Sequence, residues 1–445
     1  MSKRDPELLI IGAGPAGLSV AYAYPGRSRI LEAQSEVGGL CRSIEFGGGV
    51  FDIGGHSFHT PHPQVRELVE RLMAGRWVSQ RRDARVYFGG QIIDYPFQEH
   101  FDQIADPRIV AECRDGLAAA SLAAGADTFE DWIVGRFGAG VARHFMLPYN
   151  RKLWARDLRR MSCDWVGERV AGAPESAAPR SAPARRPLHA QSEVGYPAHG
   201  GFAEIYKALA GRCGPIELCA PVCDIDPERR TALAADGRSW SWDRLVSTAP
   251  LPLLVRMVRG CPGEIIALAD RLEYVSLKVL LILVARGFEA QPQRVYAADA
   301  AIPPHKTAFN HSSSPSLRRR PVQAVTCEIS HSAEKPAPPE ADLERATLDW
   351  LFDAGLVADR GDFAQTRWID VRYAYPVYTD DRAAIVRQIR DHLAGLGVFS
   401  VGRFGAWQYV NSDACIDEGL RLGAALAGEG LGAGAYRKGD PVGAL

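Results

Sequence analysis

Three histidines gather in one short segment of the chain, VFDIGGHSFHTPHP at residues 50–63. His56 directly follows two glycines, and His59 and His62 come soon after it, with no cysteine close by. Such imidazoles can support a neighbouring charged ring, or they can form a surface turn in which each has its own partner. The residues alone leave this choice open, so the role of the segment depends on the elements around it.

A glycine-rich segment near the start of the chain has the chemistry of a phosphate cradle. In ELLIIGAGPAGLSVAYAY (7–24), a short apolar strand is followed by Gly12, Gly14 and Gly17 and then by a helix rich in Ala, Leu and Val. The first glycine permits a tight turn, the second lets a pyrophosphate approach the backbone, and the third lets helix and strand pack closely. The phosphate would lie at the helix N-terminus, where free N–H groups favour an anion.

A carboxylate follows this turn at the spacing of a ribose ligand. SRILEAQ (28–34) predicts a second strand that leads to Glu32, about 20 residues beyond the first glycine. EVGGLCRS (36–43) then adds a second pair of glycines with Arg42 and Ser43. This pattern resembles the glutathione-reductase-like FAD proteins, including amine oxidases and protoporphyrinogen oxidase, and implies FAD. A nicotinamide enzyme with a glycine-rich loop is the alternative.

Composition and charge narrow the classes of function. A chain of 445 residues can build two or three subdomains around a large core. The net charge is −1 and the dense basic runs are short, which argues against nucleic acid. The nine cysteines are scattered without a CxxC pair, so we expect buried thiols in a reducing compartment and no metal. We also expect a cytoplasmic protein, because no run approaches the ~20 apolar residues of a membrane span.

The order of these patterns predicts an α/β fold with a Rossmann-like FAD-binding domain, a helical insert and an antiparallel β-sheet domain. Helix formers dominate the region after residue 103, Ala, Pro, Ser and Arg dominate 171–192, and strand-like runs recur from 272 to 375. FSVGRFGAWQY (399–409) and the helix-like segment after it return the chain to the FAD domain. The expected division is 1–100 (FAD domain, first part), 101–192 (helical substrate- and nucleotide-binding insert with a mobile loop at 171–192), 193–265 (FAD domain, second part), 266–395 (antiparallel sheet substrate domain) and 396–445 (FAD domain, C-terminal part).

Motifs spread over nearly the whole chain resemble one family of enzymes. The chain is very similar to UDP-galactopyranose mutases, and closer to the eukaryotic type than to the common bacterial type. The resemblance rests on FDIGGHSFHT (51–60), GGQIIDYPFQ (89–98), LPYNRKLWA (147–155), MSCDWVGERVA (161–171) and GRFGAWQY (402–409), which occur in the family's order.

This resemblance implies a use of flavin without net redox change. In these mutases reduced FAD (FADH−) attacks the anomeric carbon of UDP-galactopyranose through N5, and a covalent flavin–sugar intermediate then allows reclosure to the furanose. His56 would lie next to N5 and support the reduced ring. The implied partner is a UDP-hexose, with no nucleic acid and no membrane; NAD(P)H is a candidate reductant, and a homo-oligomer is a candidate assembly.

The resemblance also assigns roles to single residues. Aromatic and amide groups would surround the uracil, while arginine, lysine and tyrosines would bind the diphosphate. The catalytic set is His56, Arg169 and Lys306. The FAD-binding set is Gly12, Gly14, Pro15, Ala16, Gly17, Glu32, Gly38, Gly39, Leu40, Arg42, Ser43, Gly55, His56, Val222, Gly402, Arg403 and Ser412. The substrate-binding set is Tyr95, Phe97, Gln98, Asn150, Trp154, Arg169, Tyr296, Lys306, Tyr375 and Tyr409.

Two segments depart from the mutase pattern. PPHKTAFNHSSSP (303–315) carries Lys306 where the mutases have a second diphosphate arginine, so a point charge replaces a planar fork. NSDAC (411–415) differs from the usual sequence near the flavin. The identity of the sugar is therefore not decided, and both galactose and a modified hexose remain candidates. An FAD-dependent oxidoreductase of the amine oxidase or protoporphyrinogen oxidase type and a non-catalytic nucleotide-binding protein remain alternatives. An oxidase would not need Arg169, Lys306 and the tyrosines, and a non-catalytic binder would not need to keep both GGHSFH and GRFG.

Overall fold

The computed structural model describes residues 8–120, 125–166, 193–285 and 291–427. Arg169 and the expected mobile loop at 171–192 lie outside these ranges. None of the helices within them combines the length and apolar character needed to cross a bilayer.

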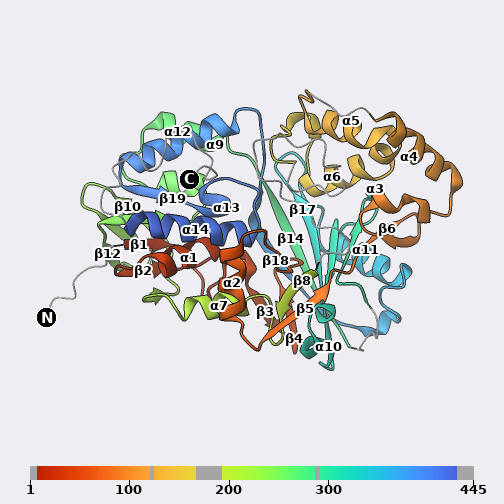
Figure 1. Cartoon of the computed structure of the whole chain (residues 1–445), viewed down its shortest axis with the longest axis horizontal. Helices are drawn as coiled ribbons and strands as arrows, with labels where there is room; N and C mark the ends of the chain where they lie inside the picture. Colours follow the sequence, from red (N-terminus) through yellow and green to blue (C-terminus); the bar gives the residue numbers. More distant parts are fainter. Residues whose placement is uncertain (1–7, 121–124, 167–192, 286–290, 428–445) are drawn as a thin grey trace.

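A parallel five-stranded sheet forms the centre of the lobe that the sequence predicts to bind the flavin, here called the flavin-domain lobe and drawn on the left in Figure 1. Its strand order draws on three distant parts of the chain, as expected for a discontinuous domain. The strands in spatial order are β19 (Val398–Ser400), β13 (Arg244–Ser247), β1 (Leu8–Ile11), β2 (Ser28–Leu31) and β9 (Ile216–Glu217).

Alternating side chains of the central strand supply two different cores. Leu8 and Ile10 lie in the core beneath α1 (Pro15–Ala23) and α14 (Ser412–Ala427), whereas Leu9 and Ile11 lie in the core on the opposite face. Figure 1 shows α1 and α14 side by side. Their backbones approach so closely that a Cβ on Gly419 would stand 2.4 Å from the Ala16 carbonyl oxygen.

Smaller elements cover this sheet. Helices α2 (Pro63–Leu72) and α7 (Glu204–Ala210) contribute to the core on the α1 side. The opposite side carries α8 (Leu251–Met257), α9 (Gly263–Asp270), α12 (Arg382–Gly395) and the antiparallel strands β10 (Val222–Asp226), β11 (Thr231–Ala234) and β12 (Ser239–Ser241).

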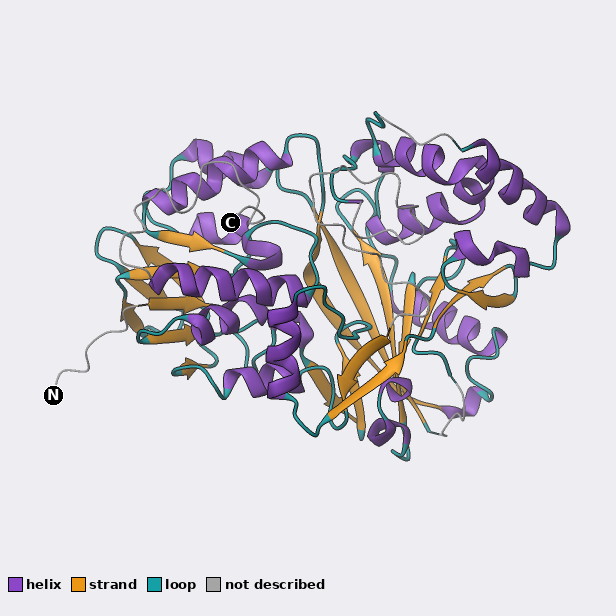
Figure 2. Ribbon diagram, viewed as in Figure 1, coloured by secondary structure: helices purple, strands orange, loops and turns teal. Residues whose placement is uncertain are grey.

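A seven-stranded sheet forms the centre of the second lobe (Figure 2). Its neighbouring strands are antiparallel, except that β6 and β15 run parallel. One face carries the helical insert, and α11 (Glu340–Asp353) covers the other. In spatial order the strands are β18 (Phe363–Pro376), β14 (Tyr274–Val284), β17 (Gln323–His331), β16 (Lys306–Phe309), β15 (Arg294–Ala297), β6 (Ala84–Phe88) and β7 (Gln91–Asp94).

The helical insert packs through close helix contact and aromatic side chains. It contains α3 (Phe97–His100), α4 (Pro107–Ala119), α5 (Phe129–Val141) and α6 (Leu147–Trp154). Asp106 caps α4 and Thr128 caps α5, each by accepting a hydrogen bond from a first-turn backbone N–H. A Cβ on Gly140 would stand 2.0 Å from the Glu112 carbonyl oxygen, so glycine permits the crossing of α4 and α5.

Two elements lie on the other side of the expected domain boundaries. Strands β6 and β7 fall within 1–100, yet they extend the seven-stranded sheet because β6 pairs with β15. Helix α12 falls within 266–395, yet its apolar residues Ile385, Ile389 and Leu393 pack into the flavin-domain core. Both placements depend on long-range pairing that neighbouring residues do not reveal.

Candidate active site

The glycine turn has the geometry that a dinucleotide requires. Gly12 adopts φ +100°, and a Cβ on Gly17 would stand only 2.0 Å from the Gly12 carbonyl oxygen. Pro15 and Ala16 open α1 directly after this turn. Glu32 is buried beside it, where Oε2 accepts from the Ala13 N–H at 2.7 Å. The free helix N-terminus and the adjacent carboxylate fit the pyrophosphate and ribose of FAD.

The second glycine pair closes against the first turn. The Gly38 N–H donates to the Ala13 carbonyl at 2.8 Å, and a Cβ on Gly39 would stand 3.3 Å from the Gly14 Cα. Leu40 lies in the short 3₁₀ helix Gly39–Cys41, with Arg42 immediately after it. The Ser43 hydroxyl donates to Asp52 at 2.6 Å, which ties this segment to the start of the histidine segment.

The C-terminal return contributes Gly402, Arg403 and Ser412. The Gly402 N–H donates to the buried Glu418 carboxylate at 3.1 Å, and Ser412 opens α14. The Arg403 guanidinium donates to the Val410 carbonyl at 2.8 Å and the Ala374 carbonyl at 3.1 Å. Arg403 therefore fastens the glycine turn at α13 (Gly402–Gly405) to the end of β18. Val222 begins β10, on the side of the flavin-domain sheet opposite α1.

The three histidines of the 50–63 segment have separate environments. His56 stacks on Phe202 at 4.9 Å between ring centroids, and its Nε2 lies 3.0 Å from the Ile53 carbonyl oxygen. Burial lowers the pKa of His56, so its imidazole is neutral near pH 7. Burial also lowers the pKa of His59. His62 instead lies 3.7 Å from Asp417 of α14. His56 is the histidine of this segment whose pKa responds to the charges of Lys306 and Glu328 on the seven-stranded sheet.

That charged face is built by register across three strands. Tyr296 on β15 pairs with Lys306 on β16, and Lys306 pairs with Glu328 on β17. Lys306 Nζ lies 2.7 Å from Glu328 Oε1, which also accepts from the Gly55 N–H at 2.9 Å. The Tyr375 hydroxyl donates to the other oxygen of Glu328 at 3.0 Å. One buried carboxylate thus joins the lysine, the histidine segment and a substrate-binding tyrosine predicted from the sequence.

Two arginines flank Tyr296, and the sequence reasoning named neither. Arg82 donates to the Tyr296 hydroxyl at 3.2 Å and lies over the Tyr95 ring at 4.7 Å. Arg294, two residues before Tyr296 on the same strand, donates to Ser57 at 2.7 Å. Burial alone would raise the pKa of Tyr296, but the two guanidinium groups, together with the Lys306 ammonium, outweigh burial and lower the pKa to about 8. The surroundings of this hydroxyl therefore favour negative charge.

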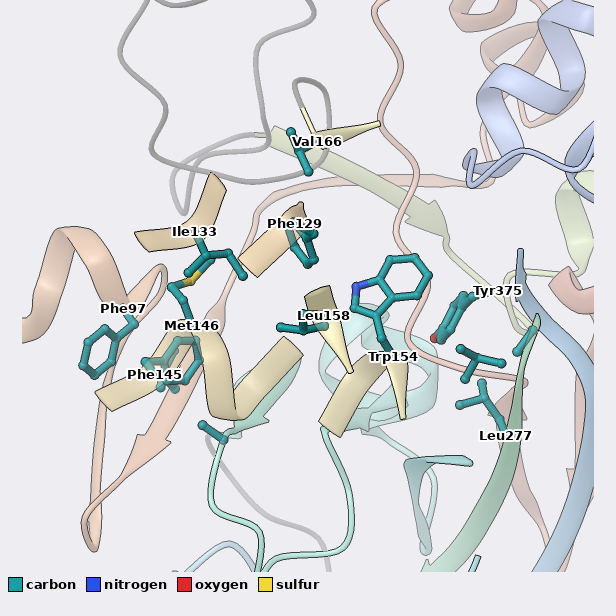
Figure 3. Close-up of a cluster of buried hydrophobic side chains, with 14 of the residues drawn as sticks. Phe97, Phe129, Ile133, Phe145, Met146, Trp154, Leu158, Val166, Leu277 and Tyr375 are labelled. Carbon is teal, nitrogen blue, oxygen red and sulfur yellow. The ribbon is translucent and has the colours of Figure 1, made fainter. Parts of the chain in front are cut away.

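The predicted uracil-binding residues divide into two environments. Tyr95 stands 5.0 Å from the Tyr296 ring, beside the cations. Phe97 stacks on Phe145 at 4.7 Å and is fully buried in the insert core. Trp154 is fully buried at the other end of the cluster, near Tyr375 (Figure 3). Contact between uracil and Phe97 or Trp154 stays a prediction.

The remaining polar members of the predicted substrate set are also held by the insert. The buried Asn150 amide donates to the Met146 carbonyl at 2.8 Å, and Gln98 is buried in α3. Tyr409 adjoins Trp154 and Tyr375, with ring centroids at 5.2 and 5.3 Å. No group of three or more His, Cys, Asp or Glu within the described ranges is arranged to hold a metal ion.

The fold and the glycine turn define an FAD-binding protein with a two-lobed α/β architecture. A family model described as flavin containing amine oxidoreductase matches residues 16–436, and the chain belongs to this family. The expected α/β fold and flavoprotein class are thereby confirmed, and the cofactor class is a flavin.

The similar proteins are enzymes with different names. Coproporphyrinogen III oxidase of Mycobacterium tuberculosis (strain ATCC 25618 / H37Rv) is 24% identical over 409 residues, covering 86% of this chain and 89% of that protein. The structure of reduced UDP-galactopyranose mutase superposes with a TM-score of 0.87 at 24% identity, covering 99% of this chain and 97% of the other. Cyclohexylamine oxidase from Brevibacterium oxydans IH-35A gives a TM-score of 0.69 at 17% identity, covering 95% and 99%. These structural likenesses establish the fold.

Proposed function

We propose that the protein is a flavin-dependent mutase that interconverts the pyranose and furanose forms of a UDP-hexose, with UDP-galactopyranose as the reference substrate. The observation that carries the proposal is the pair of buried arginines around Tyr296, next to the segment that holds His56. A buried cluster of cationic and phenolic side chains suits a diphosphate, whereas an uncharged amine or an apolar substrate has no use for it. The likeness to reduced UDP-galactopyranose mutase over 99% of the chain supports the same assignment.

The side chains of this cluster would bind and orient the nucleotide. Charge-assisted hydrogen bonds to phosphate contribute about 1.5–3 kcal/mol each, so two guanidinium groups account for a substantial part of the affinity. Tyr95, stacked under Arg82, offers a ring face on the uracil side. Because the two arginine side chains are buried, they would keep water from the diphosphate while the bond between sugar and phosphate breaks.

Other residues would hold the flavin and support its reactive edge. The glycine turn, Glu32 and the α1 N-terminus suit its pyrophosphate and ribose. When bound and reduced, FAD would supply the electron-rich N5 that displaces UDP from the anomeric carbon. His56 is kept neutral by burial and fixed between Phe202 and the Ile53 carbonyl, so it can accept or donate one hydrogen bond beside that edge. NAD(P)H is the reductant that we propose.

An FAD-dependent oxidase is the second candidate function. The match to the mycobacterial coproporphyrinogen III oxidase over 86% of the chain favours it. The two functions differ in electron balance, because an oxidase passes electrons to oxygen at every turnover and a mutase returns its flavin unchanged.

The test compares reduced and oxidised enzyme. Protein reduced with dithionite under argon is incubated with UDP-galactopyranose, oxidised protein is incubated in air, and the products are separated by chromatography. We expect furanose product from the reduced protein alone, over many turnovers for each reduction. Equal conversion by oxidised protein would exclude the mechanism. A protein without mutase activity that oxidises coproporphyrinogen III and forms hydrogen peroxide would be an oxidase.

A further inference from the structure

Arg294 is a buried arginine at the centre of the candidate site. It lies on β15 with 8% of its surface exposed, two residues before Tyr296. Residues two apart on a strand point to the same face, so both side chains project toward the histidine segment. The bond from Arg294 Nη2 to the Ser57 hydroxyl, at 2.7 Å, confirms this direction.

The charge of Arg294 has no carboxylate partner in the part of the chain that the structure describes. Its contacts there are the hydroxyl groups of Ser57 and Tyr296, and its Nε is buried without a hydrogen-bond acceptor. A buried guanidinium normally forms its full set of bonds, because removing a charge from water is costly unless it is paired. An anion supplied by a ligand would satisfy both the charge and the vacant donor.

Lys306 is in the opposite situation. Its ammonium group already pairs with Glu328 at 2.7 Å, and the Glu328 carboxylate is only 2% exposed. Moving Lys306 onto a phosphate would leave this buried carboxylate without its cation, which is strongly unfavourable. The same carboxylate would also repel a diphosphate that approached the lysine closely.

We propose that Arg294, rather than Lys306, is the second cationic residue that binds the diphosphate of the substrate. The inference rests on the proposed function. Lys306 on β16 lacks the planar fork of an arginine, but Arg294 on the neighbouring strand β15 has it. This fork can bind two phosphate oxygens at once. Ser57 orients the fork from the residue next to His56. A bound diphosphate therefore also holds the histidine segment in place.

The experiment measures binding of UDP, uridine and inorganic pyrophosphate to the full FAD-loaded protein by calorimetry. Arg294→Gln should weaken the binding of UDP and of pyrophosphate by about tenfold to a hundredfold and leave the affinity for uridine unchanged. Arg294→Lys, which keeps the charge and loses the fork, should weaken both by about threefold to tenfold. The Arg294→Lys variant also tests the proposal if Arg294→Gln does not fold.

Arg85→Gln is the matched control. Arg85 lies on β6, the strand next to β15, but pairs in register with Val295, whose side chain belongs to the core on the other face. It is bonded to Asp83 and Asp94 on the surface. Arg85→Gln removes a positive charge from the same sheet, but on the face away from the site. The affinity for UDP should therefore change by less than about twofold.

The outcomes separate this inference from the proposed function. UDP and pyrophosphate affinities that are unchanged in both Arg294 variants would overturn the inference, even if the protein isomerises UDP-galactose. A wild-type protein without mutase activity that binds pyrophosphate through Arg294 would overturn the function and keep the anion site. Loss of uridine affinity in parallel with UDP would mean that the substitution disturbs the whole pocket, which contradicts a role confined to the diphosphate.

Discussion

Lys306 and Glu328 form an ion pair across the adjacent strands β16 and β17, with 2.7 Å between Nζ and Oε1. The carboxylate also receives hydrogen bonds from the Gly55 N–H and the Tyr375 hydroxyl. These contacts fix the position of His56 relative to the sheet, because Gly55 is the residue before it. The ion pair therefore organises the site as well as stabilising it.

Glu328→Gln should destabilise the protein strongly. The amide keeps the shape of the carboxylate but leaves the Lys306 charge without its partner, and breaking a buried pair costs roughly 3–5 kcal/mol. Denaturant unfolding of the FAD-loaded protein measures the change. The double variant Glu328→Gln with Lys306→Met removes both charges and should recover part of the loss. A single variant as stable as the wild type would contradict the prediction.

Acid should destabilise the protein through Glu328 and His305. Burial alone would raise the pKa of Glu328, but the Lys306 ammonium holds it at about 2, and burial lowers the pKa of His305 to about 3. Both values lie below the ordinary ones, so the unfolded chain binds protons that the folded chain does not. Each contribution is fully present above the ordinary pKa, 6.5 for His305 and 4.5 for Glu328, and is lost as pH falls toward the folded value.

His305→Gln tests the histidine share of this pH dependence. Between about pH 6.5 and 4.5, the slope of unfolding free energy against pH should decrease by up to about 1.4 kcal/mol per pH unit. The exposed His199, replaced in the same way, is the control and should leave the slope unchanged. Equal slopes in the wild type and in His305→Gln would mean that burial does not lower the pKa of His305 in the folded protein.

Gly17→Ala should reduce the FAD content. We expect the wild-type protein to be yellow and to release FAD on denaturation. A Cβ at Gly17 would stand 2.0 Å from the Gly12 carbonyl oxygen and would force the phosphate turn apart. Flavin absorbance per mole of protein measures the loss. Gly211→Ala, whose Cβ would meet ordinary contacts at 3.6 Å, should retain FAD. Full FAD content in both variants would contradict the assigned cradle.

His56→Ala should lower turnover by roughly a hundredfold while UDP affinity changes by less than about threefold. The imidazole adjoins the reacting edge in the proposed function, whereas the nucleotide contacts lie around Tyr296. Single-turnover rates of the reduced protein are compared with calorimetric UDP affinities. His62→Ala is the control, since His62 turns toward Asp417. A loss of UDP affinity alone would place His56 in the nucleotide pocket instead.

Arg169→Ala should weaken UDP binding by about tenfold to a hundredfold and slow the chemical step. This expectation rests on the resemblance to the mutases, because residue 169 lies outside the described ranges. Arg159→Ala provides a control, since Arg159 is exposed and bonded to Asp157. Affinity and rate equal to those of the wild type would remove Arg169 from the site.

Local patterns were sufficient where neighbouring residues determine the structure. The glycine turn with its flanking strand and helix, the C-terminal return and the long strands β14, β17 and β18 all follow from short-range periodicity and turn chemistry. The pairing of β6 with β15 could not be predicted in this way, because neither strand alone encodes the register between distant strands.

The missed site residues have a common physical cause. Arginine is usually exposed, so Arg82 and Arg294 read as surface charges until the sheet buries them beside Tyr296. Glu328 is the one acidic residue of the largely buried strand β17, and that was a usable signal. A carboxylate within a buried strand needs a cation opposite it, and Lys306 lies there.

The presence of β1 and β19 in one sheet also sets an order of assembly during synthesis. Helix α1 is complete at Ala23, but α14, which packs along it, begins at Ser412. At roughly 5–20 residues per second, the ribosome needs on the order of a minute to supply the second helix. Until then the apolar side of α1 is not buried by α14, and the phosphate turn lacks the residues that the C-terminal part of the site contributes. The nascent chain must therefore be kept from aggregating while its cofactor site is incomplete, and flavin capture follows the synthesis of α14.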